Sequence, residues 1–292
     1  MPVIDTHIHL FDINRPQGVP WPPKDNAVLY KTALPSRYRK LAEPHGIVGA
    51  IEVECSPWLE DNQWVLDVMA KEDIMVGTIG DLELEKPDFA RNLERFRKNP
   101  LFLGIRYGNL WGRDFHARVS DPAFIAGIKR LADAGLTLDT ANPNPLLTAD
   151  LLRLTNAAPG LRLVIDHLPQ LNPPTGAAAR KAYEAGLAEL GRNPNVFVKI
   201  SEVLRRVDGR VPKDVAFYKD RLDHLFGVFG EDRVLFGSDW PNSDTWAPYG
   251  DVFGVVHEYF TAKGRAVAEK YFWRNSIRAY RWKPRNARQP RG

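Results

Sequence analysis

The feature that most constrains the fold is an alternation of short β-branched runs with longer amphipathic stretches along the 292 residues. Strands that alternate with helices form βαβ units, and βαβ units build parallel sheets. Eight runs have the length and composition of strands. The predicted strands are Val3–His9, Val48–Glu54, Met75–Gly80, Leu101–Arg106, Leu136–Thr140, Arg162–His167, Val196–Ser201 and Val234–Ser238.

Eight such strands in a chain of this length predict an α/β fold with a single closed (β/α)8 TIM barrel. An open doubly wound sheet is the alternative, but no glycine-rich phosphate loop follows the first strand. We assign residues 1–282 to the barrel and residues 283–292 to a basic C-terminal tail that we expect to fray. The Pro-rich segment Arg15–Pro23 is expected to form a lid or wall over the barrel mouth.

Charge and hydropathy exclude several classes of partner. The net charge is only +4, and much of the basic excess lies in the tail, so we expect no nucleic acid partner. No apolar run is long enough to cross a membrane. The N-terminus has no signal-peptide pattern, and the single cysteine, Cys55, excludes an intrachain disulfide. We therefore expect a cytoplasmic protein that acts on a small molecule, with its oligomeric state left open.

Ionisable side chains gather at the predicted carboxyl ends of the strands. His7 and His9 face the same way because strand side chains alternate. The other strand ends contribute Glu54, Arg106, Asp139, His167, Lys199 and Asp239. Burying such groups costs several kcal/mol each unless they are paired or bound to a metal. TIM-barrel enzymes carry their active groups at this end, so the pattern predicts an active site there.

The His-x-His spacing suits two imidazoles on one divalent cation, with zinc as the first choice. His7, His9, His167 and Asp239 are the candidate metal ligands. The same four groups are also the candidate catalytic residues, and they could instead act without a metal as an acid/base and hydrogen-bonding cluster.

Further side chains are expected to contact the substrate. Arg106 and Lys199 offer positive charge for a carboxylate or hydroxyl group, although Lys199 could instead pair with Glu52 or Glu54. Aromatic side chains on the loops can form a sugar-stacking wall, or they can simply pack the loops. The remaining candidates for substrate binding are Glu54, Tyr107, Trp111, Trp58, Trp240 and Asp139.

Several motifs resemble the amidohydrolase superfamily. They are IDTHIHLFD at 4–12, LGIRYG at 103–108, LVIDHLPQ at 163–170, VFVKIS at 196–201, LFGSDWPNS at 235–243 and NSIRAY at 275–280. The match is closer to the amidohydrolase-related branch that holds sugar lactonases and 2-pyrone-4,6-dicarboxylate lactonase. Two-metal members of the superfamily carry a lysine or glutamate on the fourth strand and a histidine on the fifth. This chain has Arg106 and Asp139 there, so the resemblance implies at most one cation.

The resemblance implies a hydrolase that opens a lactone, and a sugar-acid lactone is the preferred substrate. Asp239 would be the general base, and His7, His9 and His167 would polarise the carbonyl with or without a metal. A metal-dependent, non-oxidative decarboxylase of an aromatic or aminomuconate-type acid is the alternative. A catalytically degenerate barrel that only binds ligands is a weaker one, because all four ligand-type residues are present.

Overall fold

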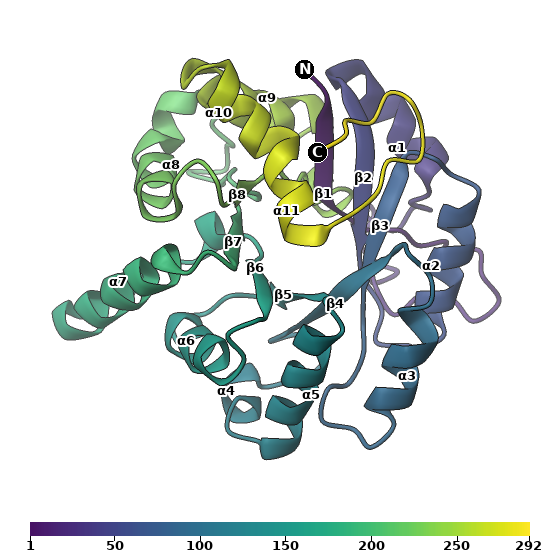
Figure 1. Cartoon of the computed structure of the whole chain (residues 1–292). Helices are drawn as coiled ribbons and strands as arrows, with labels where there is room; N and C mark the ends of the chain where they lie inside the picture. Colours follow the sequence, from purple (N-terminus) through teal and green to yellow (C-terminus); the bar gives the residue numbers. More distant parts are fainter.

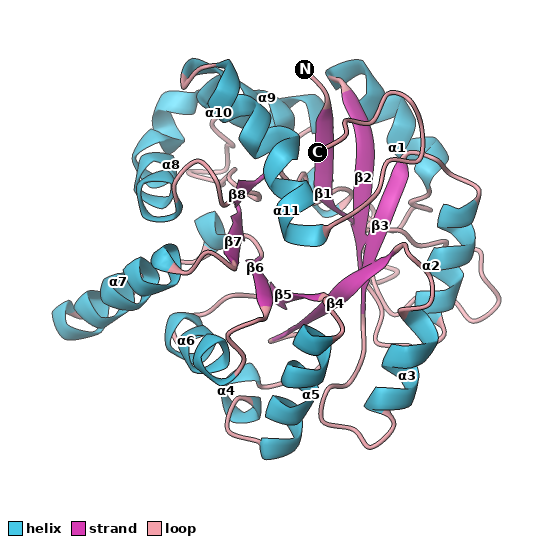
Figure 2. Cartoon of the chain, viewed as in Figure 1, coloured by secondary structure: helices cyan, strands magenta, loops and turns pink.

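The computed structural model describes residues 1–292 and confirms the (β/α)8 barrel. Eight parallel strands follow one another in chain order around one sheet, and helices surround them (Figures 1 and 2). The strands are β1 (Val3–Ile8), β2 (Ile47–Val53), β3 (Met75–Gly80), β4 (Phe102–Gly108), β5 (Thr137–Ala141), β6 (Arg162–Ile165), β7 (Val196–Lys199) and β8 (Val234–Leu235). Every strand is buried on nearly its whole length, as expected for a parallel sheet that is covered on both faces.

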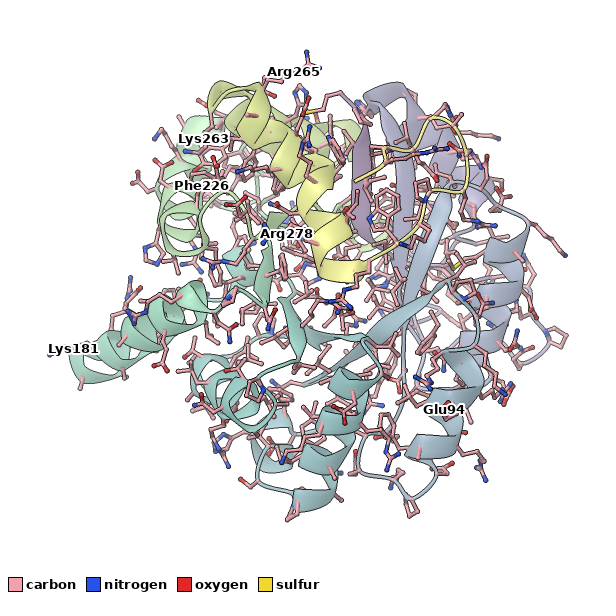
Figure 3. The ribbon with its side chains drawn as sticks, viewed as in Figure 1. Glu94, Lys181, Phe226, Lys263, Arg265 and Arg278 are labelled. Atoms are coloured by element: carbon pink, nitrogen blue, oxygen red, sulfur yellow. The ribbon has the colours of Figure 1, made fainter.

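The helices form the outer layer of the barrel. They are α1 (Pro35–Ala42), α2 (Asp61–Ala70), α3 (Phe89–Phe96), α4 (Phe115–Arg118), α5 (Pro122–Asp133), α6 (Leu147–Ala157), α7 (Ala177–Arg192), α8 (Val215–Phe229), α9 (Tyr249–Ala262), α10 (Arg265–Glu269) and α11 (Asn275–Tyr280). Their charged side chains point outward, as Glu94, Lys181 and Arg265 show (Figure 3). No helix has the length and apolar character that a membrane span requires.

The barrel closes because the chain after β8 runs beside β1. The Thr6 amide donates to the Phe236 carbonyl at 3.0 Å, and the Asp239 amide donates to the His7 carbonyl at 2.8 Å. Gly237 permits this approach, since a Cβ there would lie 2.8 Å from the Cβ of His7. Closure therefore places Asp239, from the end of the chain's last strand, beside the two histidines of the first.

Three strands end two or three residues earlier than the sequence predicts. β6, β7 and β8 stop before His167, Ser201 and Ser238. His167 and Asp239 have φ values of 52° and 60°, in the left-handed region that strands do not contain. The backbone therefore turns at these two residues, which directs both side chains across the barrel mouth.

The expectation that the C-terminal tail frays is wrong. Arg285 donates hydrogen bonds to the carbonyls of Met69, Glu72 and Met75, at 2.7–2.8 Å. The Gln289 amide is buried and donates to the Val48 carbonyl at 2.9 Å. Arg285 and Gln289 thus bind carbonyl groups of α2, β2 and the start of β3, and α11 lies across the same end of the barrel (Figure 1).

Replacing Arg285 with methionine is expected to lower the free energy of unfolding by about 2–3 kcal/mol, because four carbonyls, including that of Ala70, lose a charged donor. Denaturant titration of the variant against the parent measures this loss. Arg291→Met is the matched control, since Arg291 is exposed and makes no hydrogen bond or ion pair. Equal stability of both variants would show that the tail contributes nothing to the fold.

Candidate active site

The structure brings together four of the predicted residues around one oxygen atom. Nε2 of His9 lies 3.1 Å from Oδ1 of Asp239, and Nε2 of His7 lies 3.4 Å from it. Nε2 of His167 lies 3.7 Å from the same oxygen. All four side chains are buried, with Asp239 only 1% exposed. A carboxylate that faces three imidazoles can accept a proton, bind a cation, or do both.

A buried carboxylate beneath the site, Asp5, holds the turn that carries Asp239. Oδ1 of Asp5 accepts the Ser238 amide at 2.8 Å and the His7 amide at 3.2 Å. Oδ2 accepts the hydroxyls of Tyr38 and Tyr249 at 2.8 and 3.0 Å. These bonds tie the end of β8 to β1. Sequence reasoning missed Asp5 because simple alternation places it with His7 and His9, whereas the irregular register after Asp5 turns its carboxylate towards Tyr38 and Tyr249.

Burial and neighbouring charges shift the pKa values of Asp239 and of the histidines around it. Burial by itself would raise the pKa of Asp239, but His167, His7 and His9 together hold it well below its usual range. Burial and the nearby Lys199 charge lower the pKa of His7, and burial lowers that of His167. Asp239 is therefore ionised at neutral pH, as a general base must be.

The hydrogen-bond partner of His9 shows which of its ring nitrogens carries a proton. Nδ1 of His9 lies 2.7 Å from the Val53 carbonyl, which can only accept, so this nitrogen carries the proton. In a neutral imidazole, Nε2 of His9 then carries the lone pair, which a cation beside Asp239 could take up. Nδ1 of His167 lies 2.8 Å from the hydroxyl of Ser201, which can serve as donor or acceptor.

Lys199 lies beneath the histidines and is 0% exposed. Its Nζ donates to Asp139 at 2.8 Å and lies 2.9 Å from Asp166. Tyr280 of α11 donates to the same Asp139 oxygen at 2.7 Å. Contrary to the expectation of substrate contact, neither Lys199 nor Asp139 reaches the pocket, because each points inward below its strand end. The partners of Lys199 are also not Glu52 or Glu54.

A pocket of about 240 Å³ opens above the cluster. The predicted residues that line it are His9, Arg106, Trp111, His167 and Asp239. The other lining residues, which we did not predict as site residues, are Trp21, Cys55, Leu110, Asn142, Gln170, Glu202 and Asn242. Most of these lie on loops, whose paths follow from tertiary packing rather than from sequence periodicity.

Three aromatic candidates lie away from the pocket. Tyr107 follows Arg106 on β4, so it points outward, where it packs against Phe124. Trp240 is fully buried against Tyr38, because the backbone turns at Asp239 and sends the next side chain behind the barrel wall. Trp58 is 39% exposed and does not line the pocket.

Glu54 does not line this pocket but orders two residues that do. Nε of Arg106 donates to Glu54 Oε1 at 2.9 Å, and the Trp111 indole donates to Oε2 at 3.1 Å. The Arg106 charge is therefore already paired with a buried carboxylate.

Glu202 and Asn242 form a polar pair beside Asp239. The Asn242 amide donates to Oε1 of Glu202 at 3.0 Å and to Oδ2 of Asp239 at 2.7 Å. Burial and the neighbouring Asp239 charge raise the pKa of Glu202 well above its usual range. Glu202 directly follows the predicted seventh strand, so strand-end position was the signal that could have identified it.

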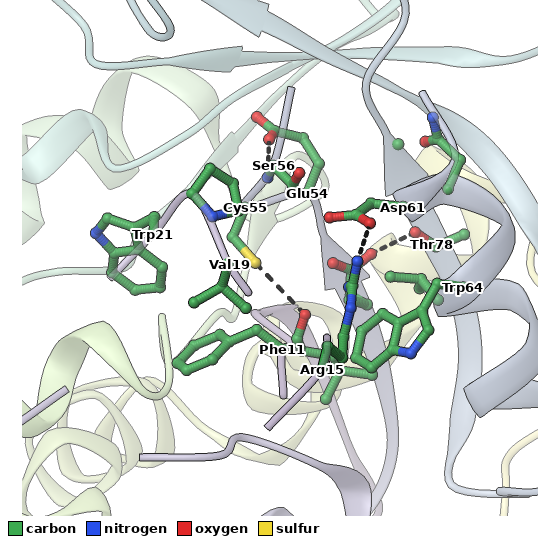
Figure 4. A pocket seen from close by; sticks show the side chains of 16 residues that line it. Phe11, Arg15, Val19, Trp21, Glu54, Cys55, Ser56, Asp61, Trp64 and Thr78 are labelled. Carbon is green, nitrogen blue, oxygen red and sulfur yellow. Dashed lines mark hydrogen bonds and ion pairs between the residues drawn. The ribbon is translucent and has the colours of Figure 1, made fainter. Parts of the chain in front are cut away.

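A smaller cavity of about 20 Å³ adjoins the pocket (Figure 4). Trp21 and Val19 lie on one side of it, and Trp64 lies on the other. The segment Arg15–Pro23 thus forms a wall beside the active site, and the cavity has room for about one water molecule. Cys55 lines both spaces. Strand alternation from Glu54 would turn it away from the barrel interior, but β2 ends at Val53 and the alternation stops there.

The residues present fit a divalent cation centred on Asp239. One group of potential ligands is His7, His9 and Asp239, and a second is His167, Glu202 and Asp239. The ligand atoms within each group lie within 4.8 Å of one another. His9 already offers the lone pair that a metal needs, and Nε2 of His7 has no hydrogen-bond partner.

Comparisons with known proteins show the family of this chain. A model of the amidohydrolase family matches residues 4–282. An L-fucono-1,5-lactonase from Burkholderia ambifaria is 28% identical over 85% of this chain and 83% of its own length. A second L-fucono-1,5-lactonase, from Burkholderia multivorans, is 25% identical over 92% of each chain. The crystal structure of a Burkholderia multivorans amidohydrolase with bound zinc superposes with a TM-score of 0.84 at 22% identity, over 97% of this chain and 100% of that one.

Proposed function

Because the chain belongs to the amidohydrolase family, we propose that it is a hydrolase that opens a lactone ring, with a neutral sugar-acid lactone as its substrate. The convergence of three imidazoles on the Asp239 carboxylate, at the mouth of the barrel, carries this proposal. The two relatives named as L-fucono-1,5-lactonases support it, since each match covers most of both chains.

The pocket lining favours a neutral substrate over a dicarboxylate. Arg106 is the only lysine or arginine in the lining, and Glu54 already neutralises it. The remaining polar groups include the amides of Asn142, Gln170 and Asn242, which can donate to and accept from hydroxyl groups. Trp21 and Trp111 offer flat apolar faces for a sugar ring. These features suit a polyhydroxylated lactone.

The reaction needs a base, a stabilised oxyanion and a proton for the leaving alkoxide. Asp239 accepts a proton from water as the water oxygen attacks the acyl carbon. The bond between that carbon and the ring oxygen then breaks. The ring oxygen takes up the proton that Asp239 accepted and becomes a hydroxyl group, which returns Asp239 to its ionised form. Polar groups fixed around the carbonyl oxygen, with His167 and Arg106 nearest the pocket, lower such barriers by about 3–4 kcal/mol per strong donor.

A divalent cation, with zinc as the first choice, would be held by His9 and Asp239 with either His7 or His167. When bound, it would supply Lewis acidity at the substrate carbonyl and help to deprotonate water. Asp5, Lys199 and Asn242 then serve to hold the ligating and basic groups in place.

A pH-indicator screen of sugar lactones and pyrone acids, run with and without a chelator, tests the proposal. We expect acid release from at least one sugar-acid lactone, no CO₂ release, and loss of turnover in the chelator that returns on adding zinc. Turnover that survives the chelator would mean that the cluster works without a metal. Release of CO₂ from an aromatic acid, with every lactone left intact, would replace the proposed function by a decarboxylase.

A further inference from the structure

The barrel floor contains a group of charges that the proposed chemistry does not use directly. Lys199, Asp139 and Asp166 are all fully buried. Burying three ionised groups costs several kcal/mol each before pairing, so a lysine at this position needs a physical reason. The contacts of its ammonium group suggest one.

The three hydrogens of the Lys199 ammonium have three acceptors in reach. Two are the carboxylates of Asp139 and Asp166, at 2.8 and 2.9 Å. The third is Nδ1 of His7, at 3.1 Å. An ammonium group can only donate, so Nδ1 of His7 must present its lone pair. An imidazole that accepts a hydrogen bond at Nδ1 is neutral, because the doubly protonated ring has no lone pair.

A neutral imidazole whose Nδ1 accepts a hydrogen bond carries its proton on Nε2. Nε2 of His7 lies 3.4 Å from Oδ1 of Asp239. His9 is set the opposite way, because the Val53 carbonyl holds the proton on its Nδ1. The two histidines of one motif therefore differ: His9 carries a proton on Nδ1, and His7 carries its proton on Nε2.

We propose that Lys199 is a positioning residue that fixes the proton of His7 on Nε2, so that His7 points an N–H group at the Asp239 carboxylate oxygen, 3.4 Å away. This inference rests on the proposed role of Asp239 as the base. A cation held at Asp239 would then take His9 and His167 as its imidazole ligands, because His7 has no free lone pair on that side. His7 and Lys199 do not line the pocket, so their effect falls on the chemical step rather than on substrate binding.

Nitrogen NMR of the full chain, with ¹⁵N-labelled histidine, reads the His7 tautomer directly. The His7 signals are identified by their absence from His7→Gln. In the parent protein, dialysed against a chelator, we expect protonated Nε2 and unprotonated Nδ1 for His7. In Lys199→Met, the proton should move to Nδ1, which lies 3.6 Å from the Asp166 carboxylate. Protonated Nδ1 in the parent protein would overturn the proposal, whether or not the protein hydrolyses lactones.

Kinetics provide the second readout. Lys199→Met should lower kcat by about 10- to 100-fold and leave KM unchanged, as is typical when the partner of an active-site histidine is lost. Lys199→Met/Asp139→Asn keeps the net buried charge of the parent and retains Asp166, so it covers the case in which the single variant fails to fold. An unchanged tautomer and kcat in the folded double variant would also overturn the proposal.

Lys270→Met is the matched control. Lys270 pairs with Glu231 and Asp232 near the surface and touches no histidine. It should leave both the His7 signals and kcat as they are in the parent protein. A loss of kcat in this control equal to that in Lys199→Met would attribute the effect to general destabilisation and remove the proposed role of Lys199.

Discussion

Replacing Asp239 with asparagine is expected to lower kcat about 10³-fold, because an amide cannot take the proton that the attacking water must lose. The substitution keeps the size of the side chain and two polar atoms, so the cluster of His7, His9 and His167 keeps its neighbours. Hydrolysis of the substrate found in the lactone screen, followed at saturating concentration, measures the effect. Circular dichroism and thermal unfolding establish that the variant is folded.

Asp244→Asn is the matched control for this variant. Asp244 lies five residues further along the same loop, pairs with Arg37 at 3.0 Å, and does not line the pocket. It should retain the parent kcat. If Asp239→Asn keeps more than about a tenth of the activity, Asp239 is not the base, since a lost general base costs at least two powers of ten.

Replacing Asp5 with alanine is expected to lower the free energy of unfolding by about 3–5 kcal/mol. Four donors lose their acceptor in a fully buried place: the amides of His7 and Ser238 and the hydroxyls of Tyr38 and Tyr249. Each buried donor left without a partner costs about 1–3 kcal/mol, partly relieved where a water can enter. Denaturant titration measures the loss, and activity should fall as well because the turn before Asp239 is released.

Asp5→Asn keeps the shape of the side chain and its capacity for hydrogen bonds, and it removes the carboxylate charge. The asparagine carbonyl can accept both backbone amides, and its NH₂ group can donate to the tyrosine hydroxyls, which rotate to accept. We therefore expect a loss of only about 1 kcal/mol. If Asp5→Asn destabilises the protein as much as Asp5→Ala, the site requires a carboxylate charge, and the hydrogen-bond explanation is wrong.

The sequence predicts the barrel well because its signal is local. Alternating strand and helix patterns repeat along the chain, β3 has the predicted bounds Met75–Gly80, and the motif at 275–280 forms α11. The sequence predicts β6 and β8 two or three residues too long at their carboxyl ends. The reason is that the left-handed conformation of His167 and Asp239 has no signature in hydrophobic periodicity. Fraying of the tail was predicted from its polarity, which gives no information about the carbonyl groups that Arg285 binds.

The sequence by itself determined the barrel, the strand ends that carry ionisable groups, and the residue types of the catalytic cluster. These depend on periodicity, on residue order and on side-chain chemistry. The tertiary structure alone decided that Lys199 lies beneath His7, that Asp5 holds the turn before Asp239, and that Glu202, rather than Trp240, faces the pocket. Such contacts join residues up to 233 positions apart, and their directions are set by barrel closure and loop packing, which no local pattern encodes.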